Sequence, residues 1–211
     1  MKKSWQLLTL LLAVATLSLA IKVTLNKSAE KNVKTDVNTE QVIIDNIMTR
    51  SSVRNYTSQK VDKEKIEILL KAGMAAPTAG NKQPWELLVV DDKEILTGIT
   101  KLIKGAHMAD KAPLAICVLG SPDKALVPEY WMQDCSAVSE NILLAAHGMG
   151  LGAVWCGAYP DNNTGKVEGL KKLLNLPEGT YTLSVIVIGH PAGESVVKDK
   201  WNPEKVHYNR Y

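Results

Sequence analysis

Two arginines and two serines lie within five residues of each other, in the string Arg50-Ser51-Ser52-Val53-Arg54. A guanidinium group presents a planar fork of N–H donors that matches the oxygens of a phosphate. Neighbouring serines add hydroxyl and backbone donors to such a fork. Taken alone, the string is equally typical of a solvated basic turn after a helix. Its chemistry is that of a site that grips a phosphate monoester.

A second polar segment follows after one helix length, from Ala76 to Trp85. Small and amide side chains alternate there with two prolines, and the residues of interest are Pro77, Thr78, Ala79 and Asn81. Proline and asparagine are typical of turns. The backbone and side-chain polar groups of this turn can face a flat heterocycle, so we expect a binding loop.

Apolar periodicity predicts the elements that position these segments. Helices are predicted at 40–49, from Asp62 to before Pro77, at 95–103, 129–147 and 167–174, and strands at 87–90, 114–119, 153–155 and 183–188. Because the first helix leads directly into Arg50, the phosphate-binding residues should lie at a helix end. The continuous apolar run at 114–119 is typical of a strand covered on both faces. Helices alternating with about four strands favour a layered arrangement with the sheet between helices.

The first 39 residues differ in composition from the rest of the chain. Lys2 and Lys3 precede an apolar run of 14 residues, Leu7–Ala20, which as a helix reaches about 21 Å against a hydrocarbon core of roughly 30 Å. We therefore predict a signal peptide at 1–20, with an uncleaved membrane anchor as the alternative. Residues 21–39 are polar and lysine-rich, as in a disordered tether, and residues 40–211 are the expected folded domain. The expected location is exported, periplasmic or membrane-anchored, with the cytoplasm as the alternative.

Charge and residue spacing exclude several classes of function. The chain of 211 residues has a formal net charge of +3, and Lys2 and Lys3 contribute two of these charges. No basic stripe suggests nucleic-acid binding. The four histidines have no metal-ligand spacing, so we expect no metal site. The three cysteines form no C-x-x-C pair and are not expected to staple the fold.

The segment from Gly148 to Gly157 has two features that bear on cofactor binding. The glycines Gly148, Gly150 and Gly152 follow a predicted helix and precede a strand, the reverse of a dinucleotide fingerprint, so they predict a helix end and a tight turn. After them, Trp155, Cys156 and Gly157 end the strand, where backbone N–H groups can meet a ring edge. Cys156 has no histidine nearby in the sequence, which argues against a nucleophilic thiol.

Residues Glu40 to Tyr211 resemble the nitroreductase family, through the pairing of the arginine–serine string with the Pro77–Trp85 segment and through the C-terminal string from Val206 to Tyr211. The resemblance implies an α+β fold, a three-layer α-β-α sandwich with a central, mostly antiparallel sheet of about four to five strands. It also implies a homodimer that binds FMN at two sites across the subunit interface. The residues implied in cofactor binding are Arg50, Ser51, Ser52 and Arg54 with Lys198 and Lys200 at the phosphate and ribityl chain; Pro77, Thr78, Ala79 and Asn81 reaching the other subunit's flavin; and Trp155, Cys156 and Gly157 near the ring.

The activity implied by the resemblance is ping-pong oxidoreduction. FMN accepts a hydride from NAD(P)H at N5, and a small-molecule acceptor such as a nitroaromatic or a quinone then takes the electrons. No catalytic side chain is expected, because the flavin carries the chemistry. Two alternatives remain open: another reaction of the family, such as reductive dehalogenation or flavin fragmentation, and a flavin-binding envelope protein without turnover. Some family members have an acidic residue at the position of Cys156.

Overall fold

The computed structural model describes residues 38–160 and 165–211 of the chain. The leader predicted at 1–20 lies outside the described residues, as does the tether predicted at 21–39 up to residue 37. The helices and strands are α2 (Thr39–Thr49), α3 (Lys63–Met74), β1 (Trp85–Val90), α4 (Lys93–Leu102), β2 (Leu114–Gly120), α5 (Trp131–Gly148), β3 (Gly152–Gly157), α6 (Lys166–Leu173) and β4 (Tyr181–Gly189).

The four described strands form one antiparallel sheet in the order β1-β2-β4-β3. β2 and β4 lie in its centre, and all residues of β2 are buried. β1 and β3 are the edge strands. This arrangement confirms the expected antiparallel sheet and the covered strand at 114–119.

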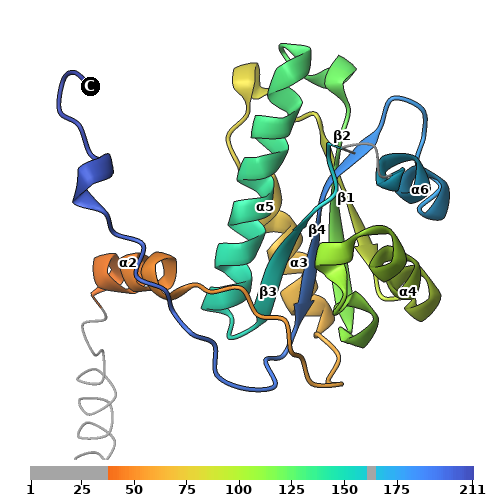
Figure 1. Cartoon of the computed structure of the whole chain (residues 1–211), viewed down its shortest axis with the longest axis horizontal. Helices are drawn as coiled ribbons and strands as arrows, with labels where there is room; N and C mark the ends of the chain where they lie inside the picture. Colours follow the sequence, from red (N-terminus) through yellow and green to blue (C-terminus); the bar gives the residue numbers. More distant parts are fainter. Residues whose placement is uncertain (1–37, 161–164) are drawn as a thin grey trace, which may run out of the picture. The chain divides into compact units, whose positions relative to one another are not determined.

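Helices cover both faces of the sheet, α3 and α5 on one face and α4 and α6 on the other (Figure 1). Side chains alternate along β2, because successive residues of a strand point to opposite faces. Ile116 and Val118 pack with the cluster under α3 and α5, whereas Ala115 and Cys117 pack with the cluster under α4 and α6. The fold is therefore the three-layer α-β-α sandwich of the α+β class that the sequence predicts.

The helix starts differ in how they are capped. Asp62 occupies the predicted N-cap position of α3, but its side chain makes no capping hydrogen bond. Asp92 does cap α4, since its Oδ1 accepts from the N–H groups of Glu94 and Ile95, both at 2.9 Å. α5 begins at Trp131 rather than at the predicted residue 129, because the short 3-10 helix η5 (Pro128–Tyr130) precedes it.

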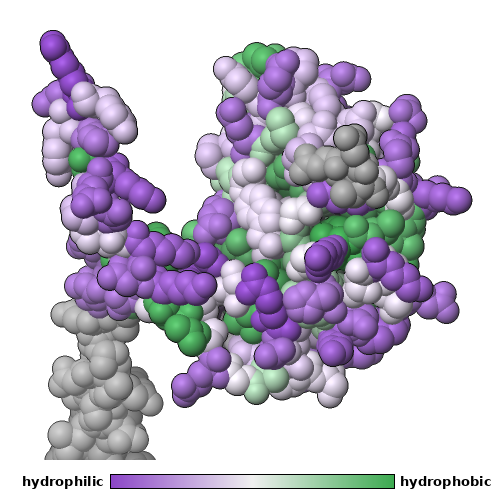
Figure 2. All heavy atoms as spheres, in the orientation of Figure 1, coloured by the Kyte–Doolittle hydropathy of each residue, from purple (hydrophilic) through white to green (hydrophobic). Residues whose placement is uncertain are grey.

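The chain divides into two compact units, residues 1–44 and 45–211, and the sheet belongs to the second. The start of the folded domain predicted at residue 40 stays a prediction. α2 crosses the boundary, and none of its residues is buried. Its five large apolar side chains, Val42, Ile43, Ile44, Ile47 and Met48, are all exposed, and Figure 2 shows hydrophobic atoms at the surface of this helix.

Candidate active site

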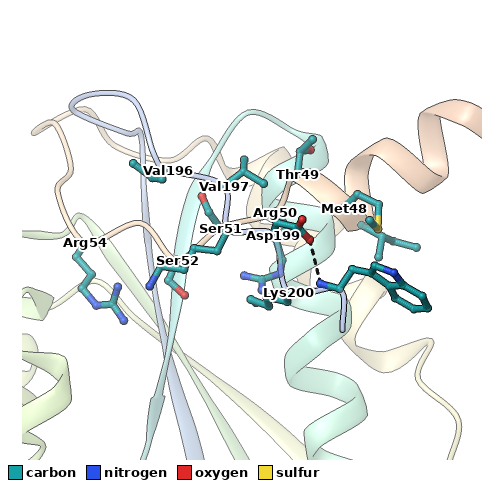
Figure 3. Close-up of a pocket in the computed structure, with 13 residues that line it drawn as sticks. Met48, Thr49, Arg50, Ser51, Ser52, Arg54, Val196, Val197, Asp199 and Lys200 are labelled. Carbon is teal, nitrogen blue, oxygen red and sulfur yellow. Dashed lines mark hydrogen bonds between the residues drawn. The ribbon is translucent and has the colours of Figure 1, made fainter. Parts of the chain in front are cut away.

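A cavity of about 860 Å³ lies between residues 47–54 and residues 196–201 (Figure 3). It is lined by six of the residues implied in cofactor binding: Arg50, Ser51, Ser52, Arg54, Lys198 and Lys200. The two segments are far apart in the sequence, yet the Ser51 Oγ donates to the Ser195 Oγ at 2.6 Å across 144 positions. The fold thus gathers the predicted cationic residues around one space.

The arginine–serine string is fixed to the outer edge of β3. Ser52 forms a parallel bridge with Ala153, and the Val53 N–H donates to the Ala153 carbonyl at 3.0 Å. This close approach requires a glycine next to Ala153, because a Cβ on Gly152 would lie only 2.6 Å from Val53 Cγ1. Gly150 has a φ of +73°, so it makes the tight turn between α5 and β3. The sequence interpretation of these glycines as a helix end and turn is confirmed.

The residues after the string are tied to the end of β4. The Tyr56 hydroxyl lies within hydrogen-bond distance of the Val53 carbonyl at 2.5 Å and of the Val187 carbonyl at 3.1 Å. The Thr57 N–H donates to the His190 carbonyl at 2.9 Å. Burial raises the pKa of Tyr56 above its ordinary value, so its hydroxyl stays a donor. The end of β4 and the start of β3 therefore restrain the string.

α5 holds the same region from its other side. Asn46 Nδ2 donates to the Leu144 carbonyl at 3.1 Å, and the Thr49 hydroxyl lies 2.9 Å from His147 Nε2. Arg50 Nε lies 3.4 Å from Glu140 Oε1. These three contacts fix where α2 ends and where the Arg50 side chain begins.

The electrostatics of the cavity favour an anion. Arg50, Arg54, Lys198 and Lys200 contribute four positive charges, whereas Asp199 is the one carboxylate among its lining residues. Asp199 Oδ1 accepts from the Trp201 N–H at 2.9 Å, so it shapes the loop. A phosphate monoester with a charge of about −1.5 to −2 suits this excess of positive charge.

Arg54 lies apart from Arg50 and Lys200 in the cavity (Figure 3). Its charge acts on Cys156, whose pKa is raised to about 11 by burial and is lowered in part by Arg54. The Cys156 thiol donates to the Gly105 carbonyl, with Sγ 3.3 Å from the oxygen. A thiol that holds its proton this strongly is a poor nucleophile, which agrees with the sequence interpretation. The charge of Arg54 therefore acts at the end of β3.

Along β3, the backbone N–H and C=O groups of successive residues point alternately towards the partner strand β4 and towards the outer edge of the sheet. The Ala153 carbonyl points outward to Val53, and the Ala158 N–H points inward to the Leu183 carbonyl at 2.9 Å. By this alternation, the polar backbone groups of Trp155 and Gly157 face the outer edge, whereas those of Cys156 pair with β4. The expectation of ring-facing backbone donors fits Trp155 and Gly157 but not Cys156.

The loop that contains Pro77, Thr78, Ala79 and Asn81 does not line this cavity. It follows α3 and contains the short 3-10 helix η1 (Ala79–Asn81). The Ala79 N–H donates to Asp134 Oδ1, at 3.1 Å, in the first turn of α5. Within a single chain, this loop therefore lies outside the cavity that the arginine–serine string lines.

Sequence reasoning missed three side chains of α5 that support these segments: Asp134, Glu140 and His147. Each is an ordinary polar residue in a predicted helix, and its partner is far away in the sequence. The one signal for Asp134 is its place next to apolar positions of the helix, and it is the one buried carboxylate among residues 38–160 and 165–211.

Comparisons with known proteins agree with this geometry. The sequence model described as "Nitroreductase family" matches residues 47–116 and 104–190. A relative from Methanothermobacter thermautotrophicus, named "Putative NADH dehydrogenase/NAD(P)H nitroreductase", is 38% identical over 80% of this chain and 87% of its own length. A crystal structure of the same name from Bacteroides thetaiotaomicron is 43% identical, with a TM-score of 0.76 over 80% of this chain and 98% of that one. An FMN-dependent nitroreductase from Clostridium difficile is 30% identical, with a TM-score of 0.74 over 80% of this chain and 99% of that one.

These comparisons contradict the expected export or membrane anchoring. The relatives are reductases named for NADH and NAD(P)H, and nothing in them points to export. Across residues 38–160 and 165–211, every helix is too short or too polar to cross a membrane. The leader predicted at 1–20 lies outside the described residues and stays a prediction.

The match to the family model covers more than half of the chain, and the antiparallel three-layer fold and the cationic cavity agree with it. The chain belongs to the nitroreductase family.

Proposed function

We propose that this protein is an FMN-dependent, NAD(P)H-dependent oxidoreductase that reduces nitroaromatics, quinones or related acceptors. The observation that carries the proposal is the cavity in which Arg50, Ser51, Ser52 and Arg54 meet Lys198 and Lys200. Family membership and the relatives' names, which include NAD(P)H and FMN, support the electron donor and the cofactor.

The donor set fits one terminal phosphate. Arg50 and Arg54 offer planar forks, Ser51 and Ser52 offer hydroxyls, and the two lysines offer mobile point charges. The cavity of about 860 Å³ also lies within the range of ligand sites, roughly 300–1,000 Å³. The described glycines make no dinucleotide fingerprint, so we propose FMN rather than a dinucleotide flavin.

The edge of β3 is the proposed contact for the flavin ring. The backbone groups of Trp155 and Gly157 face this edge, and Gly157 is exposed, so nothing on that residue blocks a ring. The Arg54 side chain lines the cavity and its charge acts on Cys156, so we propose that it lies between the phosphate end and the ring end of the site. Cys156 contributes shape and not a reactive thiol.

When bound, FMN supplies the redox chemistry, taking a hydride from NAD(P)H and passing the electrons to the acceptor in a ping-pong cycle. The residues of this chain bind the flavin and orient it. The Arg50 fork is held on α5 by Glu140, and the string is held on β3 by the Ala153 carbonyl. Positioned groups of this kind contribute to catalysis by fixing the geometry of the reactants.

We also propose that the active form is a homodimer with two sites across its interface. Three features support it: the exposed apolar side chains of α2, the loop at 77–81 that does not line its own chain's cavity, and the exposed C-terminal segment. In that segment Trp201 is 71% exposed and Tyr208 is 83% exposed. Large exposed apolar patches are typical of protein interfaces.

Steady-state kinetics test the proposed reaction. Initial rates of NADH and NADPH oxidation, measured with a quinone and with a nitroaromatic, should give parallel double-reciprocal lines at varied acceptor concentrations. Flavin binding without oxidation of either nucleotide would instead support a flavin-binding protein without turnover. Loss of halide from a halogenated acceptor, or breakdown of the flavin, would support the other reactions of the family.

A further inference from the structure

The loop at 77–83 has a strained backbone. Gly80, Asn81 and Gln83 have φ values of +57°, +55° and +50°. Glycine and asparagine adopt this left-handed region readily, but glutamine does so at a cost. Strained residues persist only when the surrounding structure holds them. Contacts with the surrounding structure must therefore hold this loop in its strained conformation.

The hydrogen bonds inside the loop are local. The Thr78 hydroxyl accepts from the Gln83 N–H at 3.3 Å, and Gln83 Nε2 donates to Asn81 Oδ1 at 2.9 Å. Both bonds can form while the loop moves as a whole. They set its internal shape but do not attach it to the sandwich.

Just beyond the loop, the Ser121 N–H donates to the Pro84 carbonyl at 3.0 Å. Within the loop, Asp134 makes the attachment. Asp134 is only 5% exposed, and its Oδ1 accepts a hydrogen bond from the Ala79 N–H at 3.1 Å. The carboxylate lies in the first turn of α5, where the helix dipole stabilises a negative charge. Asp134 thus connects the first residue of η1 to the longest helix of the described fold.

The other carboxylate oxygen, Oδ2, is buried without a hydrogen-bond partner among residues 38–160 and 165–211. A buried ionisable group is costly unless it is paired. Within the part of the chain that the structure describes, the hydrogen bond from the Ala79 N–H is therefore the one that compensates for placing a carboxylate here.

We propose that Asp134 is a positioning residue, which holds the loop at 77–83 in the strained shape that closes over the flavin of the partner subunit. This inference rests on the proposed function. Asp134 acts through the backbone of Ala79 and does not itself touch the cofactor. It sets how well the loop is preorganised, so it should change flavin affinity and turnover without contributing to the phosphate site.

Three variants separate this role from general stability. Asp134→Ala removes the acceptor, whereas Asp134→Asn keeps an oxygen that can accept from the Ala79 N–H. Ser139→Ala is the matched control, because Ser139 is also buried on α5 but bonds the Cys135 carbonyl and the Ser184 hydroxyl instead of the loop. If Asp134→Ala does not fold, Ala79→Pro removes the donor instead. Proline is tolerated at the first position of a helix.

The first readout is amide hydrogen exchange of the full-length protein without flavin. In Asp134→Ala, or in Ala79→Pro, the amides of the loop should exchange at least about tenfold faster, as expected for loss of a hydrogen bond to a charged group. Asp134→Asn keeps a neutral acceptor, so its loop amides should exchange within about threefold of the wild type, and Ser139→Ala should exchange as the wild type does. Unchanged exchange in the loop, or equal acceleration in Asp134→Asn, would overturn the anchoring role.

The second readout is FMN affinity, measured by fluorescence titration, together with kcat for NADH oxidation. Asp134→Ala should bind FMN about tenfold more weakly, while Asp134→Asn stays within about threefold of the wild type. Faster loop exchange with unchanged FMN affinity and kcat would refute the positioning role but leave the proposed function intact. If the wild type itself bound no FMN, the proposed function would fail, and the positioning role with it, whereas the exchange data would still decide whether Asp134 anchors the loop.

Discussion

Arg50 Nε lies 3.4 Å from Glu140 Oε1, so α5, which covers one face of the sheet, holds the first cation of the phosphate-binding string. The Arg50 side chain is 17% exposed and that of Glu140 is 49% exposed. The pair uses the Nε edge of the guanidinium, and a phosphate can use the two terminal nitrogens. Arg50 is thereby oriented before any ligand binds.

Arg50→Ala should weaken FMN binding by about one to two decades, because a charge-assisted hydrogen bond contributes roughly 1.5–3 kcal/mol. Fluorescence titration of the flavin-free protein measures the change. Glu140→Gln is the control, since a half-exposed ion pair contributes at most about 1 kcal/mol, and its FMN affinity should fall by about fivefold or less. An unchanged affinity in Arg50→Ala would show that the phosphate is held elsewhere.

Arg54→Ala should lower flavin occupancy to a similar degree without unfolding the protein. Arg54 is exposed, so its removal leaves no cavity in the core. Flavin content after purification and the thermal midpoint of the flavin-free protein provide the two readouts. Arg54→Lys keeps the charge but not the fork, and it should fall between the wild type and the alanine variant. A lower thermal midpoint without loss of flavin would mean that Arg54 stabilises the fold instead.

The three cysteines should make the protein less stable at alkaline pH. Burial raises the pKa of Cys117 and Cys135 to about 12 and that of Cys156 to about 11. The folded thiols stay neutral while unfolded thiols ionise above about pH 8.5. The contribution of the thiols to the free energy of unfolding is therefore fully present below about pH 8.5. It is lost as the pH rises towards 11–12, by up to about 1.4 kcal/mol per pH unit for each thiol.

Urea unfolding from about pH 7 to about pH 9.5, below the ordinary ionisation of tyrosine and lysine, measures this loss. The free energy of unfolding of Cys117→Ala should decrease less above about pH 8.5 than that of the wild type, because one thiol with a raised pKa has been removed. A free energy of unfolding that stayed constant over this range would contradict the buried, protonated thiols.

Ile43→Lys should shift the protein towards monomers, because it places a charge among the exposed apolar side chains of α2 and Ile43 does not line the cavity. Light scattering of the flavin-loaded protein measures the mass. Val89→Lys is the control, since Val89 is also exposed but lies on edge strand β1. A wild-type protein with the mass of one chain would rule out the proposed dimer directly.

Much of the fold could be predicted from local pattern. The apolar runs at 114–119 and 183–188 predicted β2 and β4, because strands covered on both faces need continuous apolar residues. The strand order β1-β2-β4-β3 could not be predicted in this way, since it depends on contacts between distant segments. Periodicity also indicated an apolar face on α2 but not what covers it, and this face is exposed in the single chain.

In the candidate site, too, residues defined by local sequence could be predicted, and residues that depend on distant contacts could not. The string from Arg50 to Arg54 was predictable because its residue types carry their chemistry in five consecutive positions. Its approach to Lys198 and Lys200 rested on the resemblance to the family. Asp134 was missed because a carboxylate in a helical pattern is usually solvated, and its role depends on Ala79, 55 positions away.

Anaerobic reduction of the purified full-length protein by NADH or NADPH, followed through its visible flavin absorbance, tests the central claim most directly. We predict a yellow protein whose band bleaches on addition of a nucleotide without any acceptor, and whose heat-released cofactor has the mass of FMN. The Arg50→Ala and Arg54→Ala variants should be paler in the same preparation. A colourless protein that takes up no added FMN, a released FAD, or a flavin band that neither nucleotide bleaches would contradict the account.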